Sequence, residues 1–172
     1  VNLGHQGPDR MRDLFAADPV LPAAVEREGA AWARGDISTF SRSIGTAEWF
    51  TEGHLANTNT PQLQTHDRFG NRIDEVEFHP AWHELMSLGI SHGVHSLPWR
   101  EPGPGANVAR AALFTQLTQV EAGVGCPISM TFSVVPALRN QPDVAAEWEP
   151  RFLSLEYDGE LKPASEKPGA LA

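Results

Sequence analysis

The spacing of apolar residues constrains the fold of this chain more than any other feature. In most of the sequence these residues recur every three or four positions, as Val108, Ala112, Leu113, Leu117 and Val120 do. That period marks one face of an α-helix, whereas a half-buried strand alternates at every second position. Because no convincing strand pattern is present, the sequence predicts an all-α fold of about six or seven helices packed as antiparallel neighbours.

Glycine and proline divide the chain into these helical segments. Proline fits the first turn of a helix and glycine commonly follows the last, so both mark boundaries. Helices are expected within residues 11–18, 21–35, 38–56, 106–123, 126–140 and 142–159, with another starting at Pro80. Gly35 is an expected stop, and Pro136 should interrupt a central, buried helix. Residues 57–78 should form a long loop, and a short hairpin within it is left open.

Composition and charge limit the classes of partner. The formal charge of −9 comes from scattered acidic residues, and the resulting field repels phosphate backbones, which argues against nucleic acid. No apolar run approaches the roughly 20 residues that cross a bilayer, and the N-terminus lacks the layout of a signal peptide. We therefore expect a cytoplasmic protein. Cys126, the only cysteine, excludes an internal disulfide, and a buried structural role is expected for it rather than a nucleophilic one.

Four histidines, His79, His83, His92 and His95, gather in one short segment. His79 and His83 are four residues apart, so on a helix they would share a face and could bind a divalent metal. A helical zinc signature would carry a glutamate between its two histidines, but Pro-Ala-Trp stands here. The other interpretation is structural: His79 caps a helix, His83 faces solvent or a carboxylate, and the later pair lies at a helix end.

The order of several motifs resembles the N-terminal helical part of an acyl-CoA dehydrogenase. These motifs are "REGAAWA", "SIGTAEWFTEGHLANTNTPQLQTHDRFGNRIDEVEFHPAWHELM", "VARAALFTQLTQVEAGVGCPISMTF" and "LKPASEKPGALA", and the similarity runs through nearly the whole chain. The similarity is greatest to the adaptive-response, AidB-like branch. In that branch the His-Pro-Ala-Trp-His segment begins a helix and no metal is expected. The resemblance therefore favours the structural interpretation of the histidines.

The resemblance also implies an incomplete flavoprotein fold. A family member would bind FAD and remove the α and β hydrogens of an acyl thioester, using a β-domain and a C-terminal helical domain that are absent from this sequence. Residues 1–18 would be an N-terminal arm, 19–158 the helical domain and 159–172 a linker. The helix after Pro127 would form one wall of the cavity, where Met130, Thr131 and Phe132 face flavin or acyl chain; simple core packing is the alternative for these three.

The resemblance further implies partners for this chain. No catalytic residue is assigned within it, because the family's base lies in the absent region. Apolar side chains of Ile128, Phe132 and Val135 should be partly uncovered, so we expect a second polypeptide that completes the dehydrogenase fold, and homo-oligomerisation of the complete unit. The chain would be either a fragment or a separate subunit. A non-catalytic helical scaffold and a His-ligated metal enzyme are the alternative functions.

Overall fold

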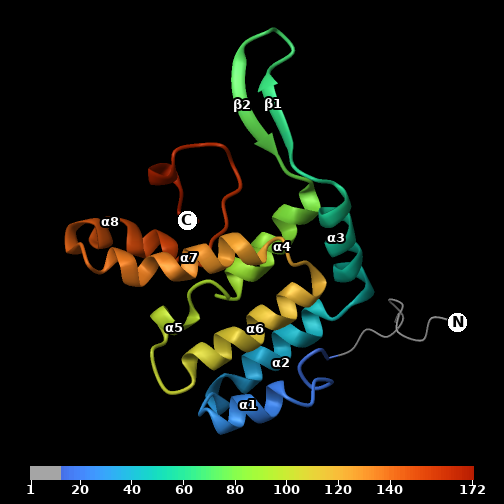
Figure 1. Ribbon diagram of the computed structural model, residues 1–172, viewed down its shortest axis with the longest axis vertical. Coiled ribbons are helices and arrows are strands. Elements are labelled where there is room, and N and C mark those ends of the chain that lie inside the picture. Colours follow the sequence, from blue (N-terminus) through green and yellow to red (C-terminus); the bar gives the residue numbers. More distant parts are fainter. Residues whose placement is uncertain (1–12) are drawn as a thin grey trace, which may run out of the picture.

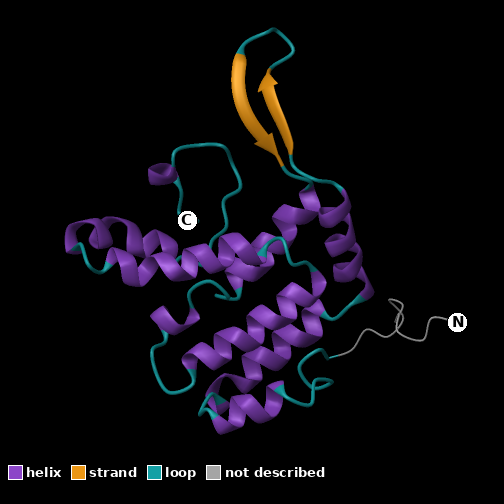
Figure 2. Ribbon diagram, in the orientation of Figure 1, coloured by secondary structure: helices purple, strands orange, loops and turns teal. Residues whose placement is uncertain are grey.

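The computed structural model describes residues 13–172 as a helical protein with one projecting β-hairpin (Figure 1). Its helices are α1 (Leu21–Arg27), α2 (Arg34–Ile44), α3 (Ala47–Thr58), α4 (Pro80–Ser91), α5 (Leu97–Arg100), α6 (Ala106–Val120), α7 (Gly125–Leu138) and α8 (Pro142–Phe152). Two 3-10 turns, η2 (Ala31–Ala33) and η3 (Ala164–Glu166), and the strands β1 (Gln62–His66) and β2 (Arg72–Glu77) accompany them. The predicted all-α class is confirmed (Figure 2). None of the helices within residues 13–172 is long and apolar enough to cross a membrane.

The N-terminal helices break at a different glycine from the expected one. Helix α1 ends at Arg27, and Gly29 then takes a left-handed φ of 77°, which only glycine adopts readily. The chain resumes through η2 into α2, so Gly35 lies inside a helix instead of stopping one. Residues 14–17 form a turn, which corrects the helix expected within 11–18; residues 11 and 12 lie outside the described part.

The main core lies between α2, α4, α6 and the start of α7. The side chains of Phe40, Ile44, Leu85, Leu117 and Ile128 are completely buried there. The apolar stripe predicted on residues 106–123 faces this core, because α6 packs against α2 on one side and against α3 on another. Helix α3 approaches so closely that a Cβ atom on Gly53 would overlap the backbone carbonyl of Val120. Small residues therefore set the distance between these helices.

Helix α7 bridges the main core and a second, smaller one. Val135 and Phe152 pack there with Ala170, while α8 lies alongside α7 (Figure 1). Ile128 and Val135 are fully buried, so the expectation that they would be partly uncovered is wrong; Phe132 is half-buried. Ile128 lies in the main core beside Leu117, and Val135 is covered by Phe152 of α8 and by Ala170 of the C-terminal segment.

Pro136 lies in the last turn of α7, and the helix continues through it to Leu138, contrary to the predicted interruption. A proline has no N–H, so the carbonyl of Phe132, four residues earlier, loses its helical donor. The indole Nε1 of Trp99 donates to that carbonyl at 2.9 Å. A side chain from α5 thus satisfies the acceptor that proline leaves free.

The segment expected as a long loop contains the hairpin that was left open. Strands β1 and β2 pair antiparallel, with Leu63 opposite Val76 and an irregularity near His66. The carboxylate of Asp67 closes the turn by accepting backbone N–H groups of Phe69 (2.8 Å) and of the residue that follows Gly70 (2.9 Å). Every residue of both strands is exposed, and the hairpin projects away from the helices (Figure 2).

Candidate functional site

Helix α7 places the three predicted cofactor contacts in different surroundings. Met130 is 54% exposed. Thr131 is fully buried, and its hydroxyl accepts the backbone N–H of Ala172 at 3.1 Å. Phe132 is half-buried and stacks on Trp99 with ring centroids 5.0 Å apart. Met130 and part of Phe132 are therefore accessible to a ligand, whereas Thr131 is occupied by the chain's own C-terminal segment.

An arginine extends the aromatic stack beyond Phe132. The guanidinium of Arg110 lies over the rings of Phe132 and Phe114, at 4.2 and 4.8 Å from their centroids. Its Nε donates to a backbone carbonyl between α4 and α5 at 3.0 Å. Burial lowers the pKa of Arg110 below its ordinary value. On the other side Arg139 lies over Trp99 at 5.4 Å. These contacts thus run from Arg139 through the rings of Trp99 and Phe132 to Arg110 and Phe114, and they link α5, α6 and α7.

The four clustered histidines contact separate partners. His79 caps α4, because its Nδ1 accepts the N–H of Ala81 at 3.1 Å, as the structural interpretation predicted. His92 ends the same helix, with Nδ1 3.0 Å from a carbonyl oxygen of the last turn. His83 bonds to a tyrosine hydroxyl, where solvent or a carboxylate was expected. Within residues 13–172 no group of three or more His, Cys, Asp or Glu side chains could hold a metal ion.

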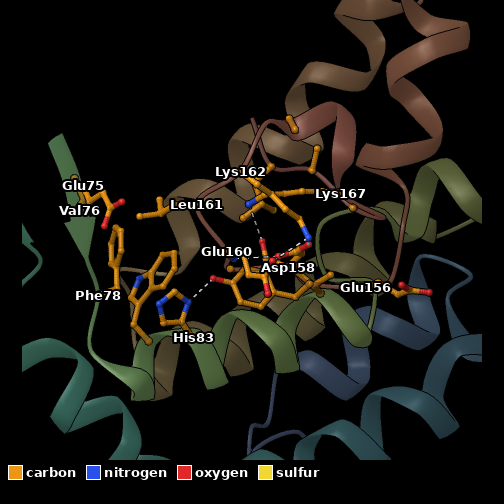
Figure 3. Close-up of a pocket in the computed structure, with 18 of the residues that line it drawn as sticks. Glu75, Val76, Phe78, His83, Glu156, Asp158, Glu160, Leu161, Lys162 and Lys167 are labelled. Atoms are coloured by element: carbon orange, nitrogen blue, oxygen red, sulfur yellow. Dashed lines mark hydrogen bonds and ion pairs between the residues drawn. The ribbon is translucent and has the colours of Figure 1, made fainter. Parts of the chain in front are cut away.

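A cavity of about 610 Å³ lies between β2, the start of α4 and the C-terminal segment (Figure 3). Phe78 and Trp82 form one wall, with their rings stacked 4.2 Å apart. A hydrogen bond of 2.7 Å joins His83 Nδ1 to the hydroxyl of Tyr157. Burial, reinforced by the nearby Asp158 carboxylate, raises the pKa of Tyr157 to about 12, so the phenol stays neutral near pH 7. The wall therefore combines apolar rings with a hydrogen-bonded polar pair.

Acidic groups outnumber basic ones around this cavity. Six carboxylates border it: Asp74, Glu75, Glu77, Glu156, Asp158 and Glu160. The ammonium group of Lys162 contacts Asp158 at 2.7 Å, and Lys167 donates to the Asp158 carbonyl at 3.0 Å (Figure 3). The hydrogen bond from Lys162 lowers the pKa of the Asp158 carboxyl. Since both lysines are engaged, the cavity favours a cation over an anion.

His95 borders the cavity from its buried side. Its Nε2 donates to the Ser154 carbonyl at 3.0 Å, because a carbonyl oxygen can only accept. Nδ1 is then an acceptor, and it has no partner among the described residues. Burial lowers the pKa of His95 to about 4, and the charges of Arg100 and Arg110 act in the same direction. His95 is therefore a neutral, structural imidazole near pH 7.

Two outcomes at this site differ from the sequence-based expectations. Cys126 is exposed at the start of α7, so the expected buried cysteine is wrong. Tyr157 and Phe78 were missed, because both lie outside the helices, where apolar periodicity carries no information. The one available signal was that Tyr157 is the chain's single tyrosine and sits in an otherwise polar stretch.

Comparison with known sequences identifies relatives of this chain. Residues 6–159 match the family described as the adaptive response protein AidB N-terminal domain. The putative acyl-CoA dehydrogenase AidB of Escherichia coli (strain K12) is 44% identical over 161 residues, covering 92% of this chain and 30% of that protein. Acyl-CoA dehydrogenase family member 11 of Caenorhabditis elegans is 27% identical over 137 residues, covering 74% of this chain and 22% of that protein. This chain thus spans less than a third of the length of these relatives.

Two solved structures share the fold. The crystal structure of Caenorhabditis elegans ACDH-11 in complex with C11-CoA has a TM-score of 0.73 at 22% identity, covering 90% of this chain and 28% of that one. The apo form of Bd2924 has a TM-score of 0.76 at 23% identity, covering 90% and 32%. Both likenesses concern the arrangement of helices, and the sequence match covers most of the chain. The chain therefore belongs to the AidB N-terminal domain family, the helical N-terminal part of AidB-like acyl-CoA dehydrogenases.

Proposed function

We propose that this chain forms one wall of the flavin and substrate cavity in an FAD-dependent oxidoreductase of the acyl-CoA dehydrogenase type. Membership of the AidB N-terminal domain family carries this proposal. The C11-CoA complex of the related fold supports an acyl thioester as the substrate class. When bound, FAD supplies a hydride acceptor for the β-hydrogen of such a substrate. In this proposal a second polypeptide that completes the dehydrogenase fold supplies the catalytic base and most flavin contacts.

The described surface of α7 fits a wall better than a complete cofactor site. Met130 presents an exposed thioether, and thioethers make favourable contacts with flat rings. Phe132 contacts the indole of Trp99 and the guanidinium of Arg110, and both contacts help to hold its ring in place. Thr131 contributes indirectly, because its buried hydroxyl fixes the C-terminal segment at Ala172. In this role the chain contributes apolar contact and excludes water, and it transfers no proton.

Flavin content of the native complex tests this proposal. The chain, tagged and isolated from its source cells, should bring a companion polypeptide and an absorbance band at about 450 nm typical of a flavin. Met130→Glu should lower the flavin bound per chain several-fold, since it places a charge against the ring. Val144→Glu, at an exposed apolar position of α8, is the matched control and should leave flavin content unchanged. A colourless complex, or equal flavin in both variants, would contradict the assignment of this wall.

A non-catalytic scaffold is the second candidate function. The observation that favours it is that both cores are closed within residues 13–172, with Ile128 and Val135 fully buried. A domain that seals its own core can persist without the rest of a dehydrogenase. A native complex that retains its partner polypeptide but contains no flavin would support this function over the first.

A further inference from the structure

Two carboxylates at the cavity of Figure 3 form no ion pair within residues 13–172. The other four each contact a donor side chain, and these pairs are Asp74 with Arg72, Glu77 with Gln64, and both Asp158 and Glu160 with Lys162. Glu75 of β2 and Glu156 of the C-terminal segment remain, and they lie at opposite ends of the labelled lining residues (Figure 3). Negative charge at two separate places suits a ligand with more than one positive charge.

An aromatic wall lines the same cavity. It consists of Phe78 and Trp82, which stack on each other, and of His83, whose ring meets Trp82 edge-on with the centroids 5.4 Å apart. All three side chains are half-buried. The faces of such rings attract organic cations and also contact methylene groups. A metal ion would lack the methylene contact, and no group of three or more His, Cys, Asp or Glu among the described residues could hold one. The aromatic wall therefore favours an organic cation.

An unsatisfied hydrogen-bond acceptor lies at the buried side of the cavity. His95 lines the cavity and is only 1% exposed, and its Nδ1 has no donor among the described residues. A buried acceptor without a donor is unfavourable, so a ligand that brings an N–H group to this side would satisfy it. The charges of Arg100 and Arg110 act on the imidazole, but neither arginine lines the cavity, so neither compensates its acidic sides. The ligand should therefore be both a cation and an N–H donor.

We propose that this cavity binds a linear aliphatic polyamine, with terminal ammonium groups at Glu75 and Glu156 and the methylene chain along the aromatic wall. Ammonium groups pair with carboxylates through charge-assisted hydrogen bonds, and an amine N–H supplies the donor that His95 lacks. The volume of about 610 Å³ lies within the range of small-molecule sites. The α7 residues of the proposed flavin wall do not line this cavity, so the polyamine site is independent of flavin binding.

Calorimetric titration of the full chain with spermidine tests this site. At about 0.1 M salt, which screens general attraction to the acidic surface, spermidine should bind with a stoichiometry of one per chain. The double variant Glu75→Gln with Glu156→Gln should raise the dissociation constant by at least about tenfold, since it removes both ammonium contacts. Glu48→Gln with Glu147→Gln is the matched control, because it removes the same charge from exposed helical positions outside the cavity. Its dissociation constant should stay within about twofold of the wild type.

Further measurements separate a specific site from general counter-ion binding. All four substituted residues are exposed, so circular dichroism spectra and melting temperatures should match those of the wild type. Excess Mg²⁺ should not displace spermidine, because it gains no methylene contact with the aromatic wall. Spermidine should shift the imidazole nitrogen resonances of His95 in NMR spectra, whereas those of the exposed His54 on α3 should stay unchanged.

Three results would overturn the polyamine site. The first is the absence of binding heat with spermidine up to about 10 mM. The second is an equal dissociation constant in the two double variants, and the third is displacement of spermidine by Mg²⁺, since either would assign the binding to general attraction by the acidic surface.

Discussion

The helical core and the hairpin of this protein differ in how much of their apolar surface is buried. In the core, Leu117 and Ile128 are fully buried and Gly53 has no room for a methyl group. On the hairpin side, Leu63 and Phe69 are more than half exposed. Contacts within residues 13–172 therefore stabilise the core, whereas the exposed apolar side chains of the hairpin gain little stabilisation from them. Substitutions in the two regions should have very different effects on unfolding.

The largest effect is expected from a truncation in the core. Leu117→Ala should lower the free energy of unfolding by about 3 kcal/mol, through lost burial and the cavity left behind. Leu63→Ala, the same change on the hairpin, should cost at most about 0.5 kcal/mol. Urea unfolding at concentrations where the chain is monomeric measures both. Equal costs for the two variants would show that the hairpin is packed in the monomer.

A decrease of similar size in the free energy of unfolding is expected on acidification, because His95 is buried and neutral. Its folded pKa of about 4 lies below the ordinary value of 6.5, so protons bind the unfolded chain preferentially. Above pH 6.5 His95 is neutral in both the folded and the unfolded chain, so it costs no stability. As the pH falls from 6.5 toward 4, the free energy of unfolding decreases progressively. The full shift corresponds to roughly 3 kcal/mol. Free energies of unfolding measured at several values between pH 7 and 4.5 should show the decline.

Two histidine variants attribute that decline to its source. His95→Gln removes the titrating group, so it should flatten the pH dependence of unfolding even though it lowers stability at pH 7. His92→Gln removes an exposed imidazole at the end of α4 and should keep the wild-type slope. An unchanged slope in His95→Gln would assign the acid sensitivity to carboxylates elsewhere.

A smaller loss than those from Leu117→Ala and from acidification is expected at the junction between the two regions. Tyr157→Phe keeps the ring but removes the hydroxyl that bonds His83 Nδ1. The expected cost is about 1 kcal/mol, the typical net value of one partly buried hydrogen bond. Thermal unfolding of this variant beside His83→Asn and the double variant measures it, since the two single effects should not add. Additive effects would mean that the hydrogen bond is absent in solution.

Helices with a complete apolar stripe could be predicted from the sequence alone. The stripe of α6 faces the core as expected, and Pro80 and His79 mark the start of α4 correctly. The ends of helices were harder to predict. Gly29 and Gly35 look alike in a sequence, but only Gly29 takes a left-handed conformation. The hairpin was ambiguous because its strands are exposed on both faces and so lack the alternation that identifies a half-buried strand.

The candidate site was less accessible to sequence reasoning than the fold. The predicted contacts at Met130, Thr131 and Phe132 rest on the family resemblance and stay a prediction. The cavity brings His83 of α4 beside Tyr157, which is distant along the chain, and no local pattern announces such a contact. Its charge arises in the same way, because carboxylates of two separate segments accumulate only after folding.

The single missing amide hydrogen at Pro136 couples two positions far apart in the chain. Trp99 donates its indole N–H to the oxygen that this proline leaves bare, and the same indole carries the stack from Phe132 to Arg139. Any change at Pro136 that restores a helical donor would compete with Trp99 for one acceptor. Proteins that keep the proline therefore have reason to keep the tryptophan, and the two sites should vary together rather than independently.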